Sequence, residues 1–319
     1  MVVSWNTREL LARCLTSMAA DARAGRAVVC VVDNASSDGS ADMVAEDFPW
    51  VELIQAGRNL GFGAAVNLGV DRAAPTPWVA PCNADIALEP GTLAALVESG
   101  ERAPGAGAVA PLLIGEDGQE QHSVFPFPDL AFTLWFNLGL HQVSRRWADR
   151  HCVSGRWNRD RSRDVPWAIG AFLLVRRTAW EQVGGFDEQQ WMYAEDLDLG
   201  WRLRRAGWST LYVPQARIRH YGSAAAAQVW GDSRTDRWMD ATYAWMLRRR
   251  GPVRTRVVAG INVAGATARV GLFWALARRD PGRWTAPLVD NREWRRVHRL
   301  GLRRRDQIGL LSAPPADAG

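Results

Sequence analysis

The sequence contains no lysine, so all 39 of its basic side chains are arginines. Arginine suits the recognition of phosphates and carboxylates because its planar group presents paired donors, although the bias also fits a GC-rich genome. Cysteine is scarce as well, and Cys14, Cys30, Cys82 and Cys152 show no paired spacing. We therefore expect reduced thiols in a cytosolic protein, with neither a disulfide framework nor a zinc site.

Other features are also missing. The apolar start is too short for a signal peptide and lacks a basic segment before it, and the chain has no internal repeats. With 319 residues and 47% hydrophobic residues, global disorder is excluded, and one large or two small domains are expected. Only the tail from Ser312, rich in Pro and Ala, is expected to be disordered.

The first third of the chain alternates apolar runs with helical periodicity. The pattern predicts strands over residues 2–4, 27–32, 51–55 and 78–81, and helices over residues 8–22, 40–47 and 63–73. This alternation predicts parallel βαβ units and an α/β fold. Asp33 and Asp85 follow two of these strands. Ligands of such sheets bind beyond the carboxyl ends of the strands, which makes both carboxylates candidate ligand contacts.

The later segments are less regular. Residues 115–164 show few clear periods, and this irregularity predicts a loop region that covers a cleft. A strand pattern returns over residues 165–176 and 209–213, and helices are predicted over 178–183 and 196–206. We expect one domain over residues 1–223, in two halves (1–86 and 87–223), followed by a basic helical region over 224–319.

The region after residue 224 contains arginine clusters at 248–250, 278–279 and 303–305. Between the first two lies an apolar stretch, 257–277, which is long enough to span a bilayer. Asn262 and Arg269 lie on one face of that helix, so we favour a helix in the membrane surface or packed on the domain over a transmembrane helix. The arginines predict attraction to anionic lipids, and the alternative is a solvated helical cap.

Two segments are candidates for nucleotide binding. Asp33, at a strand end, could accept hydrogen bonds from a base or a ribose, although its neighbours also suit a helix cap and turn. Residues 58–69 combine Arg58 with two glycines and a helix that begins near Gly63. That arrangement suits a phosphate at the helix N-terminus, and an ordinary tight turn is the alternative.

Residues 83–85 (Asn-Ala-Asp) are a candidate metal site. One carboxylate and one amide can supply oxygen ligands to a divalent cation, which would neutralise a diphosphate leaving group. An Asx-turn would explain the same residues. His220 follows a predicted strand and is a second candidate ligand for metal or phosphate, the alternative being a structural role.

Glu195, Asp196 and Asp198 cluster where a helix begins, and acidic residues there are favourable as capping charges. Residues 195 and 198 share a helical face, whereas Asp196 points elsewhere. We expect Asp196 to enter the cleft as a general base, with Asp198 serving the helix.

The order and spacing of these motifs resemble those of a family 2 glycosyltransferase with the GT-A fold. They are most similar to the rhamnosyltransferase-like branch of bacterial cell-wall and polysaccharide assembly. The resemblance covers about residues 1–223 and rests on segments 3–10, 32–40, 59–67, 83–85, 170–177, 184–188, 192–199 and 202–208. It implies a Rossmann-like mixed or parallel sheet flanked by helices, with a C-terminal helical extension.

The resemblance also implies roles for individual residues. The nucleotide-sugar site would include Val3, Ser4, Asp33, Asn34, Arg58, Asn59, Gly63, Asn67, Asn83, Ala84 and Asp85. Acceptor contacts would come from Trp167, Gly170 and Glu195, with Asp196 as the base. A Mg²⁺ or Mn²⁺ ion would be held by Asp85, and His220 is retained as a second candidate ligand. Asn83 replaces the family's first carboxylate, which predicts weaker metal affinity.

The resulting hypothesis is an inverting hexosyltransferase that moves rhamnose from dTDP-rhamnose to a glycan or lipid-linked acceptor. Another donor, such as UDP-N-acetylglucosamine or UDP-galactofuranose, is an alternative, as is a non-catalytic glycan-binding scaffold at the membrane. A nucleotidyltransferase is disfavoured because residues 4–9 offer no glycine-rich basic loop. We expect a cytoplasmic protein, peripheral on the inner face of the plasma membrane, with no nucleic-acid partner.

Overall fold

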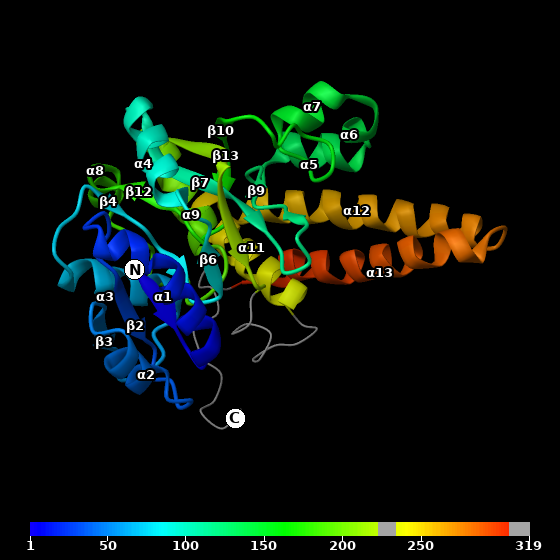
Figure 1. The fold of residues 1–319 in the computed structure, drawn as a ribbon. Helices are drawn as coiled ribbons and strands as arrows, with labels where there is room; N and C mark the ends of the chain where they lie inside the picture. The colour runs from blue at the N-terminus through cyan, green and yellow to red at the C-terminus, as the bar shows by residue number, and fades with distance from the viewer. Residues whose placement is uncertain (223–233, 306–319) are drawn as a thin grey trace. The chain divides into compact units, whose positions relative to one another are not determined.

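The computed structural model describes residues 1–222 and 234–305, which divide into two compact units (Figure 1). Unit 1 comprises Met1–Phe125 and residues 158–222. Unit 2 comprises Pro126–Trp157 and residues 234–305. The predicted disordered tail lies outside the described residues.

Unit 1 begins with a four-stranded parallel sheet in the order β3-β2-β1-β5. Strand β2 is buried throughout, whereas β3, at the edge of the sheet, begins and ends with exposed polar residues. The strands are β1 (Val2–Ser4), β2 (Cys30–Asp33), β3 (Glu52–Gln55) and β5 (Cys82–Asn83), and the helices are α1 (Arg8–Arg23), α2 (Ser40–Asp47) and α3 (Phe62–Arg72).

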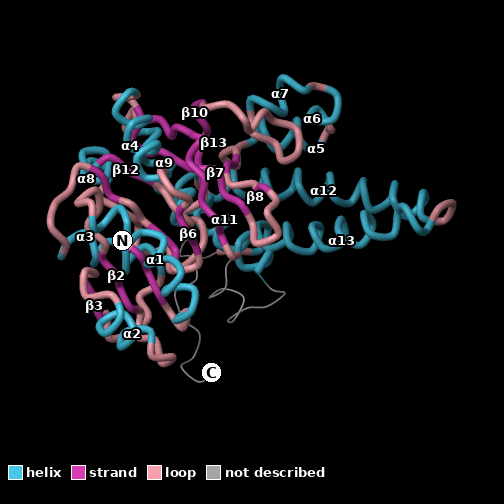
Figure 2. The backbone as a smooth tube through the Cα atoms, in the orientation of Figure 1, coloured by secondary structure: helices cyan, strands magenta, loops and turns pink. Residues whose placement is uncertain are grey.

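A second, mixed sheet follows in the order β10-β13-β7-β12-β4, with β6 paired to β13 and β8 to β7 (Figure 2). Strands β9 and β11 form a separate two-stranded ribbon. The strands are β4 (Trp78–Val79), β6 (Ile86–Leu88), β7 (Ala106–Ile114), β8 (Glu120–Gln121), β9 (Val124–Phe125), β10 (Arg163–Val165), β11 (Trp167–Ala168), β12 (Leu174–Arg176) and β13 (Ser209–His220). Unit 1 also contains the helices α4 (Thr92–Arg102), α8 (Arg177–Val183) and α9 (Glu195–Arg205).

The strand predicted over residues 165–176 is wrong as a single element, because successive parts of this run pair with different strands. Its first part pairs with β13, its middle with β9, and its last part with β7 and β4. Between them, Ala171 O accepts a hydrogen bond from Asn83 N at 3.0 Å. The two sheets therefore meet where β5 ends, and one buried hydrophobic cluster, which includes Leu11, Ile86 and Ile218, extends through both.

Unit 2 is helical in its described part. It contains α5 (Leu130–Asn137), α6 (Leu140–Val143), α7 (Arg145–Arg150), α11 (Arg234–Arg250), α12 (Pro252–Ala277) and α13 (Pro281–Arg303). Helices α12 and α13 run side by side along their length (Figure 1). The loop region expected over residues 115–164 is therefore wrong, since it contains three short helices that stack aromatic rings, such as Phe132 on Trp147 at 5.5 Å.

Candidate active site

The carboxyl end of β2 borders a hollow of about 290 Å³ lined by residues from segments 33–42 and 55–57. Asp33 is only 3% exposed, and its Oδ2 accepts a hydrogen bond from Ser36 N at 3.0 Å. No hydrogen bond from the described residues reaches its Oδ1. Buried oxygen atoms normally accept a hydrogen bond, and this one lies beside a hollow. The arrangement therefore fits the predicted contact with a base or ribose.

The other residues predicted near Asp33 hold the backbone around this strand end in place and do not line the hollow. Asn34 donates from Nδ2 to Gly61 O (3.2 Å) and accepts at Oδ1 from Leu60 N (3.3 Å). Ser4 is fully buried and lies within hydrogen-bond distance of Thr7. Val3 pairs in register with Asn83, so β1 connects the two halves of the site through its backbone.

The glycine loop packs against protein instead of leaving room for a ligand. Gly61 has φ +81°, and a Cβ there would lie 2.2 Å from Trp191 O. A Cβ on Gly63 would lie 3.0 Å from the Cβ of Phe186. The glycines are thus required by the turn over residues 186–191, and Gly63 does not offer its open side to a phosphate. The exposed Arg58 precedes this loop, and Asn59 Oδ1 accepts a hydrogen bond from Gly61 N at 3.0 Å.

Asn67 joins α3 to the same turn. Its Nδ2 donates to Phe186 O (3.0 Å) and Glu188 Oε1 (3.0 Å), and its Oδ1 accepts from Phe186 N (2.9 Å). Both polar atoms of the amide are engaged by the protein. Asn67 therefore positions the turn that precedes α9, and its predicted contact with the nucleotide sugar is not supported by this geometry.

Asp85 and His220, the two predicted metal ligands, lie together. Asp85 precedes β6 and His220 ends β13, and these strands pair in antiparallel register. The distance from His220 Nε2 to Asp85 Oδ1 is 3.5 Å, and the two residues are 6% and 5% exposed. The sequence places these residues 135 positions apart, so only the β6–β13 pairing brings them into one site.

Gln121 orients the His220 ring, a role that the sequence did not reveal. Gln121 Nε2 donates to His220 O at 3.1 Å, which places its Oε1 2.8 Å from His220 Nδ1. A carboxamide oxygen can only accept, so Nδ1 carries the proton in this arrangement. In the neutral ring, Nε2 then presents a lone pair toward Asp85. A metal-binding histidine is held in the same way by its second nitrogen.

This donor set fits a divalent cation only in part. Within residues 1–222 and 234–305, no three His, Cys, Asp or Glu side chains gather into a cluster. One carboxylate and one imidazole leave several positions for phosphate oxygens and water, as is usual where a cation is bound together with a diphosphate. Asn83 is half-buried beside them and could add an amide oxygen.

Asp196 is held at the start of α9 by backbone amides. Its Oδ2 accepts from Gly170 N at 3.0 Å and its Oδ1 from Leu197 N at 2.7 Å. Burial raises the pKa of Asp196, whereas these amide hydrogen bonds oppose that rise. A carboxylate that is half-buried, oriented and partly desolvated has the properties of a general base.

Glu195 differs from its neighbour. It is 8% exposed, and no described residue gives its Oε2 a hydrogen bond. Burial, followed by the nearby charge of Asp196, raises the pKa of Glu195 to about 8. Adjacent carboxyl groups in unlike environments separate into one that is ionised and one that holds its proton. We assign the charge to Asp196 because it has the amide donors.

The backbone before these carboxyl groups is strained. Tyr193 and Ala194 have φ +64° and +62°, so two consecutive side-chain-bearing residues adopt the left-handed conformation. Each such residue costs about 1–3 kcal/mol, and such strain is concentrated at functional sites. The conformation turns the chain sharply into α9, which places Glu195 and Asp196 at its first turn.

Two predicted residues have packing roles here. Trp167 is 3% exposed, its ring stacks on Phe125 at 5.3 Å, and its Cβ would lie 2.7 Å from a Cβ on Gly200. Trp167 therefore packs against α9, and its side chain does not face an acceptor. Asp198 is fully buried and forms an ion pair with Arg202 at 2.6 Å, in agreement with a role in the helix.

Sequence reasoning also missed Gln190. Its side chain is fully buried, and neither amide atom has a hydrogen-bond partner in the described part of the chain. A buried amide of this kind is costly unless another group completes it. It lies next to Trp191, in the turn that holds the glycine loop, and nothing in its sequence pattern distinguishes it from the exposed Gln189.

Comparison with known proteins gives relatives that include two rhamnosyltransferases. N-acetylglucosaminyl-diphospho-decaprenol L-rhamnosyltransferase of Mycobacterium tuberculosis is 38% identical over 207 residues, which cover 60% of this chain and 66% of that protein. Rhamnosyltransferase WbbL of Escherichia coli is 37% identical over 87 residues, or 27% of this chain and 32% of that one. The match thus spans slightly less than two thirds of the mycobacterial relative.

Two solved structures share the fold. The mannosyltransferase PcManGT from Pyrobaculum calidifontis, in complex with GDP-Man and Mn²⁺, has a TM-score of 0.55 and 18% identity, covering 94% of this chain and 83% of that chain. GalNAc-T7 with UDP, GalNAc and Mn²⁺ has a TM-score of 0.51 and 15% identity, covering 75% and 50%. The expected GT-A fold is confirmed.

The family model described as "Glycosyltransferase like family 2" matches residues 1–241. This match includes both sheets of unit 1 and every residue of the site, so the resemblance seen in the separate motifs extends over most of the chain. On this basis the chain belongs to glycosyltransferase family 2.

Proposed function

We propose that this protein transfers a sugar from a nucleotide diphosphate to a hydroxyl group of a lipid-linked glycan, with inversion at the anomeric carbon. One juxtaposition carries the proposal. Gly170 N donates to the carboxylate of Asp196, and the adjacent Ala171 O accepts from Asn83 N, each at 3.0 Å. The candidate base and the candidate diphosphate site are thus attached to the same two residues.

The proposed donor is dTDP-rhamnose. Its support is that the relatives from Mycobacterium tuberculosis and Escherichia coli are both named as rhamnosyltransferases. The hollow beside Asp33 has room for a nucleoside and a buried acceptor to recognise it. UDP-N-acetylglucosamine and UDP-galactofuranose are the alternative donors, because this hollow does not identify the sugar.

The proposed reaction is a single displacement. Asp196 takes the proton of the acceptor hydroxyl, whose oxygen forms a bond to the anomeric carbon. The bond from that carbon to the phosphate oxygen breaks, and the nucleoside diphosphate leaves from the opposite face, which inverts the centre. Glu195, in its protonated form, can donate a hydrogen bond to the acceptor next to the base.

A divalent cation belongs to this proposal. Asp85 and His220 would hold it, with Asn83 as a third possible oxygen ligand, and it would supply positive charge for the departing diphosphate. The imidazole ligand favours Mn²⁺ over Mg²⁺. Both structural neighbours were solved with Mn²⁺.

Peripheral association with the inner face of the plasma membrane, in a cytoplasmic protein, is part of the proposal. By length and composition, α12 could cross a bilayer, and 17% of its most apolar window is buried. We place it in the membrane surface because Arg269 donates to Asn291 Oδ1 (2.7 Å) and Asn137 Oδ1 (3.2 Å) near the middle of the helix. Its partner α13 is strongly charged and could not follow it through hydrocarbon.

The domain division stays a functional proposal. In it, residues 1–86 bind the nucleotide, residues 87–223 present the base and the acceptor site, and residues 224–319 contact the membrane. The helical segment 126–157 lies inside the second of these ranges but belongs to unit 2. Membrane contact is therefore not limited to the region after residue 224.

The test is product formation from labelled dTDP-rhamnose with a lipid-linked N-acetylglucosamine acceptor, run beside the two UDP sugars. Asp196→Asn should keep donor binding, measured by thermal shift with and without Mn²⁺, and lose transfer. Glu181→Gln, an exposed acid on α8, is the matched control and should retain both. Full turnover by Asp196→Asn would refute the base, and donor binding without transfer by wild type would favour the scaffold.

A further inference from the structure

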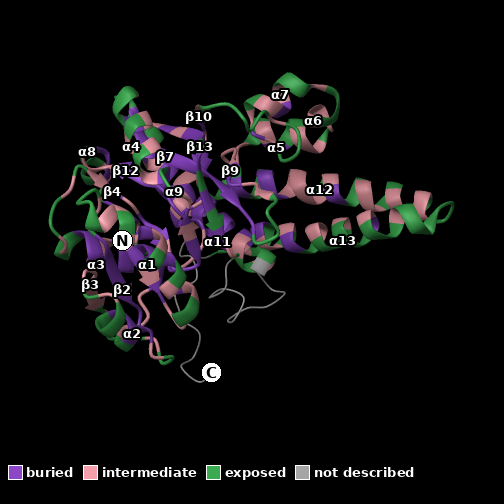
Figure 3. Cartoon of the chain, viewed as in Figure 1, coloured by how far each residue is buried: buried purple, intermediate pink, exposed green. Residues whose placement is uncertain are grey.

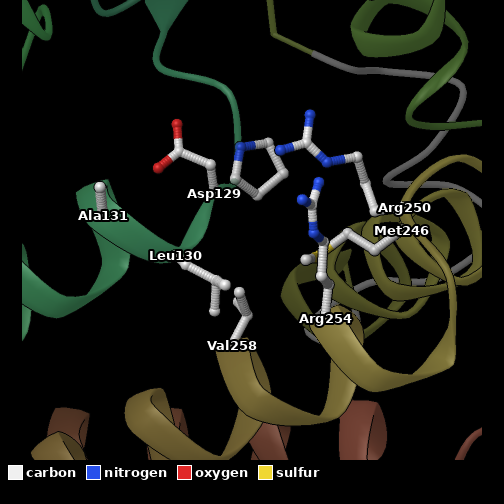
Figure 4. A pocket seen from close by; sticks show the side chains of 8 residues that line it. Asp129, Leu130, Ala131, Met246, Arg250, Arg254 and Val258 are labelled. Atoms are coloured by element: carbon white, nitrogen blue, oxygen red, sulfur yellow. The ribbon is translucent and has the colours of Figure 1, made fainter.

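Unit 2 contains a hollow of its own, with a volume of about 210 Å³, between the start of α5 and the junction of α11 with α12 (Figure 4). Its lining includes the apolar side chains of Leu130, Met246 and Val258 and the charged side chains of Arg250, Arg254 and Asp129. It lies wholly within one unit and includes none of the residues assigned to the active site.

The two arginines lie close together, and the acidic residue of the hollow, Asp129, forms no ion pair with them in the described part of the chain. Arg250 ends α11 and Arg254 lies in the first turn of α12, with Gly251 at φ +83° between the helices. In Figure 4 the two guanidinium groups lie near each other, and the Asp129 carboxylate is directed away from them. That carboxylate instead caps α5, since its Oδ1 accepts from Phe132 N at 2.8 Å.

No ion pair in the described part of the chain involves Arg250 or Arg254. Like charges that share a hollow repel each other, and an anion between them removes that cost. A guanidinium group can bind phosphate oxygens through two parallel hydrogen bonds. The pair therefore offers a site for a doubly charged group such as a diphosphate.

An exposed apolar surface adjoins the hollow. Leu130, Leu134 and Leu138 follow one another at helical spacing on α5 and are 38%, 41% and 67% exposed. On α12, Val253 and Val257 are 73% and 45% exposed. Figure 3 shows exposed and half-buried residues along both helices. Helix α5 packs on α12, where Asn137 Nδ2 donates to Asn262 Oδ1 at 2.8 Å, so the two rows belong to one surface.

The charge of the chain is concentrated in the same unit. The described part of unit 2 contains 22 Arg and only seven Asp or Glu, whereas the rest of the chain contains 17 Arg and 27 Asp or Glu. Unit 2 is therefore strongly basic although the whole chain has a net charge of only +5. A basic unit with exposed apolar rows suits a membrane surface with anionic groups.

We propose that Arg250 and Arg254 bind the diphosphate of a lipid-linked sugar, with the lipid chain lying on the apolar rows of α5 and α12. This inference rests on the proposed function for the identity of the lipid as the acceptor's carrier. An amphiphile with a diphosphate group suits this surface. Its charge would contact the paired guanidinium groups, and its apolar part would contact the apolar lining and the exposed leucines. A free nucleotide would leave the leucine row uncovered, and a neutral lipid would leave the arginines without an anion.

The experiment measures flotation of the full-length protein with three kinds of vesicle and no nucleotide sugar. The vesicles contain phosphatidylcholine alone, phosphatidylcholine with phosphatidylglycerol, or phosphatidylcholine with a few per cent of an isoprenyl diphosphate. Arg250→Gln/Arg254→Gln is compared with Arg279→Gln/Arg292→Gln, which removes the same charge from exposed positions elsewhere in unit 2. Circular dichroism checks that both variants are folded.

The first double variant should lose affinity for the isoprenyl diphosphate vesicles by about tenfold or more, since it removes two charged hydrogen-bond donors. The control double variant should keep that affinity. Both double variants should lose affinity for the phosphatidylglycerol vesicles to the same extent. An equal loss by both pairs on isoprenyl diphosphate would overturn the proposal in favour of general surface charge. Because no donor is present, this result is separate from any failure to transfer sugar.

Discussion

Replacing Glu195 by Gln should stabilise the protein increasingly as the pH rises. Glutamate has an ordinary pKa of 4.5, and burial raises the pKa of Glu195 to about 8 in the folded protein. Between these values the folded state holds a proton that the unfolded state has lost. The free energy of unfolding therefore falls from about pH 4.5 to about pH 8 and levels off above it.

The size of this effect follows from the two pKa values. One pKa unit corresponds to about 1.4 kcal/mol, so the full difference corresponds to at most about 5 kcal/mol above pH 8. Glutamine has no proton to lose and keeps the shape of the protonated side chain. We expect Glu195→Gln to match wild type near pH 4.5 and to exceed it by up to this amount at pH 8.

The assay is urea unfolding of both proteins at intervals from pH 4.5 to pH 9. All other titrating groups are common to the two proteins, so the difference between their curves isolates Glu195. Glu181→Gln, an exposed acid, should show no such trend. Adding Asp196→Asn should shrink the effect, because the charge of Asp196 is the second cause of the raised pKa. A difference that stays flat with pH would refute the protonated assignment of Glu195 and with it the division of roles between the two carboxyl groups.

Two further predictions concern the geometry of the site. Gln121→Leu removes the acceptor that fixes the His220 ring, so Mn²⁺ affinity, measured from the free-ion electron paramagnetic resonance signal, should fall by about 10- to 100-fold; unchanged affinity would exclude His220 as a ligand. Ala194→Gly relieves a left-handed residue and should raise the free energy of unfolding by about 1 kcal/mol, whereas Ala94→Gly, within helix α4, should lower it by a similar amount. A loss of stability in Ala194→Gly would show that the strain is absent.

The fold of the first third could be predicted because its signals are local. Helix α2 begins and ends at the predicted residues 40 and 47, and β1 and β3 lie within one residue of their predicted positions. The strand predicted over residues 78–81 is wrong as a parallel strand, because residues 78–79 pair antiparallel with β12 and the fourth parallel strand is β5 at residues 82–83. Residues 165–176 could not be divided correctly, because the changes of strand partner from β13 to β9, and then to β7 and β4, leave no mark on a continuous apolar run. Partner choice is decided by segments far away in the sequence.

The positions of four candidate site residues in the fold could be predicted from the sequence. Asp33 and His220 end strands, Asp85 lies between two strands, and Asp196 lies at the start of a helix; their proposed roles stay predictions. Gly63 is predicted to contact a phosphate because glycine allows close approach of the backbone, and Asn67 is predicted to contact the nucleotide sugar because the family resemblance implies it. Their actual partners are Phe186 and its neighbours, more than a hundred residues later, which no local pattern reveals.

The composition of unit 2 limits how the role of the basic region can be tested by truncation. A truncation after residue 223 would remove α11, α12 and α13 but keep α5, which lies in the middle of the catalytic range. Asn137 of α5 would lose Asn262 and Arg269, and the apolar face that packs on α12 would be uncovered. Such a protein could bind lipid through this new surface or aggregate, so lipid binding by the truncated chain would say nothing about the native one. Substitutions that keep both units whole, such as those at Arg250 and Arg254, are the sound way to separate membrane contact from catalysis.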